Sequence, residues 1–192
     1  MKLNNKNILY EYYVFLEELN DIFEKNIKKL KNINIIININ NINKSNLNKA
    51  LSIIKFSKAN KIPFYIINNY QMSIKYNAKG VFLSSNNKQL KRPLLFKKSF
   101  KIIGAAHNQL EYYKKKEQLC KKIIVSPLFY NAKYSINKIL GINKFNLLTN
   151  NWKTKTCALG GINSDNIKKL KMTKVRSLAG ISFFQKKSPL LF

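Results

Sequence analysis

The sequence contains few of the residue types on which most catalytic and metal sites depend. Its 192 residues include one histidine, two cysteines and eight acidic residues. Cys120 and Cys157 are too few and too far apart for a disulfide framework, and no Cys-x-x-Cys or Cys/His cluster indicates a zinc site. We therefore expect both cysteines to be reduced and buried.

Long apolar runs are also absent. The N-terminal residues carry positive charge but lack the apolar stretch of a secretory signal. No run approaches the roughly 18 apolar residues that a membrane-spanning helix needs. These absences predict a cytoplasmic protein with no membrane partner.

The charge is strongly one-sided, with 36 basic against 8 acidic residues and a net charge of +28. Such a balance is typical of proteins that bind nucleic acid. However, only Arg92 and Arg176 are arginine, and proteins that read bases or clamp phosphates depend on the guanidinium group. The lysines are spread along the whole chain with many Asn and Ile, residues that adenine- and thymine-rich codons encode. We interpret the charge as genome bias and expect no specific nucleic-acid partner, with a Lys-rich nucleic-acid-binding protein as the alternative.

Apolar residues make up 45% of the chain and aromatic residues 12%. This content is enough to bury one sizeable core. We predict a single domain over residues 1–192.

Apolar runs of strand length alternate with runs of helical periodicity, and no hairpin signal interrupts them. The strand-like runs are 10–16, 33–39, 64–68, 78–83, 100–106, 122–129, 156–160 and 175–182, and the helical runs are 17–30, 47–59, 70–76, 109–120, 142–148 and 167–172. Strict alternation predicts a parallel sheet, and we expect a compact (β/α)8 TIM barrel. An open doubly wound sheet is the alternative.

Polar residues gather where the predicted strands end. In either architecture, the active edge is the carboxyl end of the strands. That edge carries Asn38, Asn40, Asn68, Asn69, Ser84, Asn87, His107, Lys133, Gly160, Gly161 and Ser182. Gly160-Gly161 ends an apolar run ahead of a helix-start signal, which indicates a phosphate-binding turn, although a tight turn between strand and helix would need the same glycines.

The last residues, 185–192, are short and interrupted by proline. We predict that the closing helix of the barrel is truncated. An apolar barrel end left open in this way would be covered by a second subunit, so we expect a homodimer.

Several short motifs, in order along the chain, resemble those of the thiamine phosphate synthase / TenI family of (β/α)8 barrels. They are Ile66-Ile-Asn-Asn69 with Ala78-Lys-Gly-Val-Phe-Leu83, Ile103-Gly-Ala-Ala-His107, Ser126-Pro-Leu-Phe129, and Ala158-Leu-Gly-Gly-Ile162 with Ala179-Gly-Ile-Ser182. The resemblance extends from about residue 35 to residue 184, and the ordered set is more specific than any one motif.

The resemblance implies a role in thiamine biosynthesis with a phosphorylated small molecule as partner. Members of this family join or process the pyrimidine and thiazole halves of thiamine. By position, Gly160, Gly161, Ile181 and Ser182 would hold the phosphate of the thiazole. The chain would then bind thiazole phosphate at the C-terminal face of the barrel and join it to the pyrimidine pyrophosphate, which forms thiamine phosphate.

The other half of the expected site departs from the synthase pattern. The resemblance implies Mg²⁺ held by two aspartates, but those positions are Asn69 and Asn87. Neutral amides hold a hard cation less well than carboxylates do. The cationic residues expected after the second strand are replaced by Asn38-Ile-Asn-Asn-Ile42. A catalytically degenerate or TenI-like barrel that binds thiazole phosphate is therefore the alternative to a synthase, although the histidine that serves TenI proteins as acid and base is Ser126 here.

Three residues are candidates for catalysis, namely His107, Lys133 and Asn68. Asn38, Asn40, Asn68 and His107 are candidates for binding substrate. His107, the only histidine, has a structural alternative in which it bonds to a neighbouring loop. We interpret the run Lys114-Lys-Lys116 as a solvated helix face.

Overall fold

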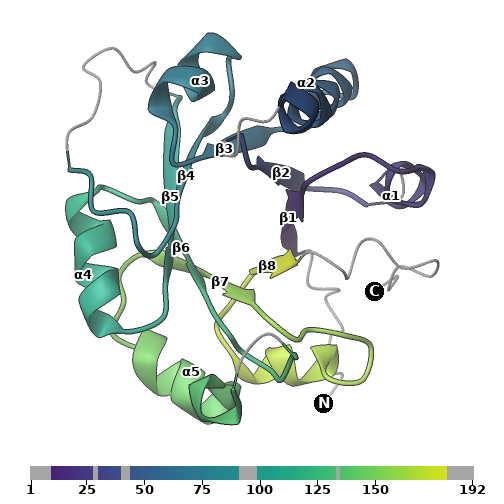
Figure 1. Ribbon diagram of the computed structural model, residues 1–192. Helices are drawn as coiled ribbons and strands as arrows, with labels where there is room; N and C mark the ends of the chain where they lie inside the picture. The colour runs from purple at the N-terminus through teal and green to yellow at the C-terminus, as the bar shows by residue number, and fades with distance from the viewer. Residues whose placement is uncertain (1–9, 28–29, 40–43, 91–98, 133–134, 181–192) are drawn as a thin grey trace.

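The structure is a computed structural model that describes residues 10–27, 30–39, 44–90, 99–132 and 135–180. Eight parallel strands form a closed barrel in chain order, with β8 paired to β1 (Figure 1). The strands are β1 (Glu11–Leu16), β2 (Ile33–Ile37), β3 (Phe64–Ile67), β4 (Gly80–Leu83), β5 (Lys101–Ala106), β6 (Lys122–Val125), β7 (Lys155–Leu159) and β8 (Ser177–Gly180). The predicted (β/α)8 barrel is thus confirmed, and the open sheet is excluded.

Helices lie outside the ring of strands (Figure 1). They are α1 (Asp21–Ile27), α2 (Lys44–Ala59), α3 (Tyr70–Lys75), α4 (Gln109–Glu117) and α5 (Gly141–Thr149), with short 3₁₀ helices η1 (Ile136–Lys138) and η2 (Ile167–Met172). The first helix begins at Asp21, later than the helical run predicts. The reason is a cap, because the side-chain oxygen of Asn20 accepts a hydrogen bond from the N–H of Phe23 at 2.8 Å.

Each strand buries side chains on both of its faces, which explains why the strands read as nearly continuous apolar runs. One residue from each strand packs inside the barrel: Tyr13, Ile36, Tyr65, Phe82, Ile103, Ile124, Cys157 and Ala179. A second set, including Val14, Ile35 and Val81, packs with outer helix residues such as Phe23. Both cysteines are free and buried, as expected. Burial raises the pKa of the Cys120 thiol to about 12 and also raises that of Cys157.

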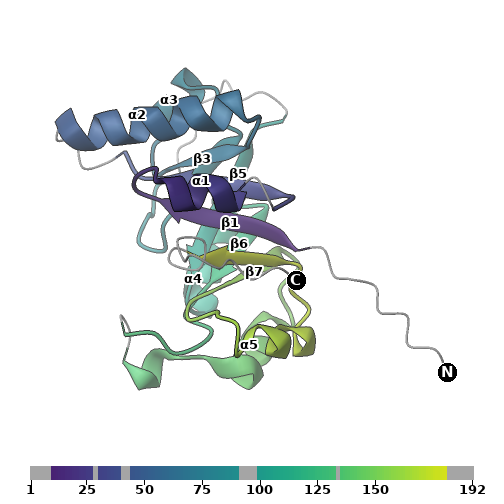
Figure 2. The same cartoon turned by 90° about the vertical axis from the view of Figure 1, so that its right-hand side faces the viewer.

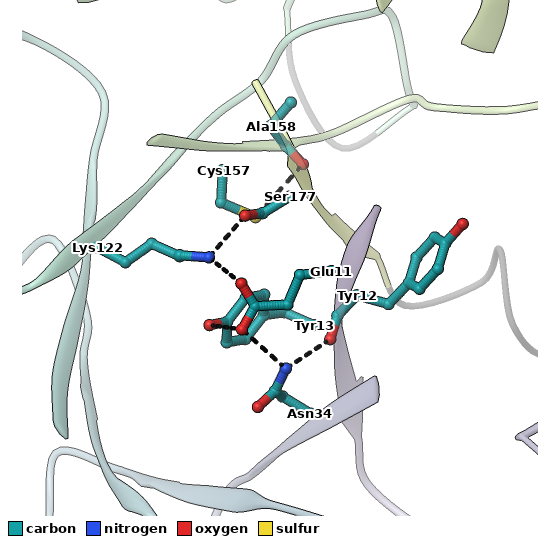
Figure 3. A network of polar contacts seen from close by, with 8 residues as sticks. All are labelled: Glu11, Tyr12, Tyr13, Asn34, Lys122, Cys157, Ala158 and Ser177. Carbon is teal, nitrogen blue, oxygen red and sulfur yellow. Dashed lines mark hydrogen bonds and ion pairs between the residues drawn. The ribbon is translucent and has the colours of Figure 1, made fainter. Parts of the chain in front are cut away.

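The N-terminal end of the barrel contains a network of polar side chains (Figure 3). The Glu11 carboxylate on β1 pairs with the Lys122 ammonium on β6. Lys122 also donates to the hydroxyl of Ser177 on β8 at 2.6 Å, and its Nζ lies 5.0 Å from the centre of the Tyr13 ring. Glu11 further accepts from the Tyr13 hydroxyl at 2.8 Å and from the Asn34 amide at 3.3 Å. The network therefore connects strands from different sides of the ring.

In the described part of the chain, no helix has the length and apolar character that crossing a membrane requires. The truncated closing helix and the homodimer inferred from it concern residues 181–192, which lie outside the described residues. Both stay predictions.

Candidate functional site

The turn after β7 contains two glycines, and both the backbone conformation of the turn and the close approach of a neighbouring loop require them. Gly160 has φ of 102° and Gly161 has φ of 65°, in the region that L side chains avoid. A Cβ on Gly161 would lie 2.3 Å from the Tyr130 carbonyl oxygen, and one on Gly160 would lie 2.9 Å from Pro127 Cα. The loop after β6 is held there by a hydrogen bond from the Phe129 N–H to the Gly160 carbonyl, at 2.9 Å. Close packing of two loops thus accounts for both glycines.

The same turn presents a row of backbone N–H groups. Among the residues that the structure describes, no acceptor is shown for the N–H groups of Gly161 and Ile162. Backbone N–H groups that follow one another in a tight turn form a concavity that suits an anion. The turn can therefore receive phosphate oxygens through its main chain.

Asparagines fold the following loop back onto this turn. The Asn163 side-chain oxygen accepts from the N–H of Asp165 at 3.0 Å, and the Asn166 side-chain amide donates to the Gly161 carbonyl at 2.7 Å. The predicted helical run 167–172 is confirmed as the 3₁₀ helix η2, which begins at Ile167. These contacts fix the loop that follows the turn.

Asn68 connects the ends of β3 and β4. Its side-chain amide donates to the Ser84 hydroxyl at 2.9 Å, and its side-chain oxygen accepts from the Ser84 N–H at 2.9 Å. Its backbone lies in the left-handed region with φ of 53°, which asparagine tolerates better than most residues. Asn68 thus connects two loops at the mouth of the barrel. The connection uses one hydrogen bond from its side-chain nitrogen and one to its side-chain oxygen.

His107 is tied to the first turn of α4. Its Nδ1 lies 2.9 Å from the Glu111 carboxylate, which also accepts the His107 backbone N–H at 2.7 Å. Asn108 caps the helix by accepting from the Glu111 N–H at 2.9 Å. Burial of the Glu111 carboxyl favours its neutral form, but hydrogen bonds from His107 and Asn108 outweigh burial and lower its pKa. His107 therefore has a structural partner, but this partner is the helix that follows it and not the neighbouring loop of the structural alternative. Glu111 also fixes the orientation of the ring.

The two positions that correspond to the family's metal ligands are used to hold the fold. The Asn69 side-chain oxygen caps α3 by accepting from the Met72 N–H at 2.9 Å. The Asn87 side-chain oxygen accepts from Gln118 at 3.1 Å and from the Gln89 N–H at 3.0 Å. Among the described residues, no cluster of three His, Cys, Asp or Glu side chains could hold a metal ion. This donor set does not fit a resident Mg²⁺, which prefers carboxylate oxygens.

A buried lysine holds the loop that carries Asn87. Lys115 is 0% exposed, and its ammonium donates to the Asn87 carbonyl at 2.9 Å and to the Gln118 side chain at 2.8 Å. Burial lowers the pKa of Lys115. The interpretation of residues 114–116 as a solvated face is therefore wrong for Lys115, because α4 turns this side chain inward beneath the loop after β4. Lys114 and Lys116 are exposed as predicted.

The remaining candidates divide into two groups. Asn38 follows β2 and is exposed, and Ser126 follows β6 and is buried. Asn40, Lys133, Ile181 and Ser182 lie outside the described residues, so their proposed roles stay predictions. Asn38, Asn68, His107 and Gly160 all follow parallel strands of one barrel and thus lie at its same end. Sequence reasoning missed Glu111, although Asn108 followed three residues later by Glu111 is a recognisable capping signal.

Beneath this end, the barrel interior is apolar. Phe15, Ile67, Ala105 and Leu159 are partly buried and pack on the interior cluster from above. The Phe15 ring lies edge-on to Phe82, with centroids 5.3 Å apart. Leu159 directly precedes the glycine turn. The end of the barrel therefore combines an apolar floor with a rim of polar groups, a combination typical of small-molecule sites.

Comparisons with known proteins point to one family. A family model described as "Thiamine monophosphate synthase" matches residues 20–184. The chain is 28% identical over 137 residues to a thiamine-phosphate synthase of Prochlorococcus marinus, which covers 71% of this chain and 39% of that protein. It is also 28% identical over 123 residues to a thiamine-phosphate synthase of Flavobacterium psychrophilum, covering 60% of each. The chain thus spans less than two thirds of these relatives.

A solved structure shows the same fold. The chain superimposes on the thiamine phosphate pyrophosphorylase of Pyrococcus furiosus with a TM-score of 0.70 and 16% identity, over 92% of this chain and 87% of the other. At this identity, the likeness supports the architecture alone.

Proposed function

The chain belongs to the thiamine monophosphate synthase family, and from this membership we propose that it acts in thiamine biosynthesis by binding the phosphate of thiazole phosphate. The observation that carries the proposal is the turn after β7, where no acceptor is shown among the described residues for the N–H groups of Gly161 and Ile162. Ile181 and Ser182 would complete the phosphate site, as their positions in the family motif imply.

The surroundings of the turn support a heterocyclic phosphate ester over free phosphate. Leu159 leads directly into Gly160, and Phe15, Ile67 and Ala105 extend the apolar floor beside it. A thiazole ring attached to a phosphate held at residues 160–162 would cover this floor and remove apolar surface from water. The His107 ring, oriented by Glu111, lies at the same end of the barrel for hydrogen bonding to such a ligand.

Joining the bound thiazole phosphate to pyrimidine pyrophosphate is the activity that the named relatives suggest. Departure of pyrophosphate needs positive charge or a metal to stabilise the developing anion. The oxygens of Asn69 and Asn87 are engaged in helix and loop contacts, and neither position offers a carboxylate. This observation favours a second candidate function, which is binding of thiazole phosphate without formation of thiamine phosphate.

Calorimetry with thiazole phosphate, and with the same thiazole lacking the phosphate, tests the binding proposal. We expect the phosphate ester to bind and the alcohol to bind at least about tenfold more weakly, since charge-assisted hydrogen bonds would be lost. Gly161 is unsuited to the test because any side chain there collides with Tyr130. Ser182→Asp, which places a carboxylate at the proposed site, should abolish binding. Ser52→Asp on the exposed face of α2 introduces the same charge as a control.

Equal affinity for ester and alcohol, or no binding at millimolar ligand, would contradict the proposal. A separate assay with both substrates and Mg²⁺, read for thiamine phosphate, distinguishes the two candidate functions. Product formation identifies a synthase. Binding without product identifies the second candidate.

A further inference from the structure

A large cavity lies at the end of the barrel opposite to the glycine turn. It has a volume of about 780 Å³ and is formed by the N-terminal ends of β7 and β8 together with α5 and the residues after η2. Figure 2 shows α5 below the barrel, beside the short helix η2 that follows β7. The two helices are in contact. The volume lies within the range of small-molecule sites. Nothing in the thiamine chemistry above uses this end of the barrel.

The charges around the cavity are almost all positive. Its basic residues are Lys122, Lys153, Lys155, Lys174 and Arg176, and its one carboxylate is Glu11. Glu11 is already neutralised, because it pairs with the buried ammonium of Lys122. The walls therefore retain four positive charges in excess.

These four side chains come from separate short segments that meet at the cavity. Lys155 is the first residue of β7 and Lys153 lies just before it, while Lys174 and Arg176 precede β8, and all four are exposed. The contacts shown for two of them are to neutral groups. Lys174 donates to the Asn150 side-chain oxygen at 3.0 Å, and Arg176 donates to the Val175 carbonyl at 2.9 Å. These contacts hold the two side chains in place and leave their positive charges without a negative partner among the described residues.

The arrangement favours an anion with several charges. Cations that converge on one concave surface repel each other, and a multivalent anion relieves that repulsion while it gains charge-assisted hydrogen bonds. Thr154, Thr156 and Asn146 add uncharged polar groups to the walls. Arg176 is one of only two arginines in the chain, and its planar fork suits two oxygens of one phosphate.

We propose that this cavity binds a multivalent phosphate compound, through the phosphate chain of an inorganic polyphosphate or of a nucleoside triphosphate. Lysine is abundant throughout this chain, so the proposal requires more than general positive charge. The distinguishing feature is concavity, since side chains from β7, β8 and the segments before them line one hollow in the surface. The exposed lysines of α4 lie on a convex helix surface and serve as the comparison.

Calorimetry with tripolyphosphate at about 150 mM salt, where the Debye length is about 8 Å, tests the proposal. We expect binding, and the double variant Lys155→Gln/Arg176→Gln should weaken it about tenfold or more because two charge-assisted contacts are lost. The matched control is Lys114→Gln/Lys116→Gln, which removes the same charge from α4. Its affinity should stay within about twofold of the unmodified protein, because neither lysine lines the cavity and salt screens exposed charges.

ATP in place of tripolyphosphate identifies the source of the phosphate. Equal affinities would indicate that the phosphate chain alone is recognised, and tighter ATP binding would indicate contacts with the nucleoside. Equal weakening by both double variants, or no binding of either probe at millimolar concentration, overturns the proposal. Ser182→Asp alters only the proposed thiazole phosphate site, so this variant should bind tripolyphosphate as well as the unmodified protein does. This result would show that the two proposals concern different sites.

Discussion

The carboxylate of Glu11, on β1, pairs with the ammonium of Lys122, on β6, across the N-terminal end of the barrel. The Lys122 side chain is only 10% exposed, whereas the Glu11 side chain is 38% exposed. Tyr13, Asn34 and Ser177 bind to one or other member of the pair. The pair thus connects opposite sides of the ring at the level where the interior opens into the basic cavity.

Removing the charge of Glu11 should destabilise the fold. Glu11→Gln leaves the buried Lys122 ammonium without its anion, and we expect a loss of about 2 kcal/mol, below the 3–5 of a fully buried pair because Glu11 is partly solvated. Urea unfolding measures the difference. Glu18→Gln breaks the exposed pair with Lys49 and should change stability little, since surface ion pairs contribute little. Equal effects of the two substitutions would contradict the role of burial.

The same carboxylate should make stability depend on pH in the acid range. Burial opposes ionisation of Glu11, but the hydrogen bond and charge of Lys122, with Tyr13 and Asn34, outweigh it and lower its pKa from 4.5. A lowered folded pKa means that the contribution is present above the unfolded pKa and is lost as pH falls through the folded one. Unfolding measured from about pH 7 to about pH 3 should show that Glu11→Gln loses less stability than the unmodified protein. Parallel curves would refute this assignment.

Gly161 and Gly141 allow backbone strain to be separated from collision. Both have positive φ, of 65° and 61°, but a Cβ meets the Tyr130 carbonyl at Gly161 and nothing within 4 Å at Gly141. Gly141→Ala should cost about 1 kcal/mol from the left-handed backbone alone. Gly161→Ala should cost about 2 kcal/mol more, because the loop after β6 must move. Chemical denaturation compares the two, and similar losses would show that the loops separate easily.

Carboxylates can be restored at the two asparagines without loss of their present contacts. The side-chain contacts shown for Asn69 and Asn87 are made by the side-chain oxygens, which aspartate also provides. We expect the double variant Asn69→Asp/Asn87→Asp to fold, and Mg²⁺ to raise its melting temperature while leaving that of the unmodified protein unchanged. Asn69→Ala, which loses the cap of α3, should cost about 1 kcal/mol. A Mg²⁺ shift of equal size in the unmodified protein would contradict the conclusion that its donor set does not fit the metal.

Much of the barrel could be predicted because its signals are local. Apolar runs such as Ile33–Ile37 and Lys122–Val125 are strands buried on both faces, and a cap such as Asn108 marks where a helix begins. The position of the glycine turn at the end of β7 follows from the same alternation. Residue identity also showed that the family's metal positions carry amides.

The sequence by itself determined the order of strands and helices, the end of the barrel at which polar residues collect, and the excess of positive charge. Only the tertiary structure decided how those residues are used. The Asn87 side chain accepts a hydrogen bond from Gln118, and Lys115 is buried beneath the same loop. Glu11 pairs with Lys122, which lies 111 residues further along the chain. The reason is that periodicity records which face of its own element a side chain occupies, whereas its partner depends on which distant segments barrel closure brings together.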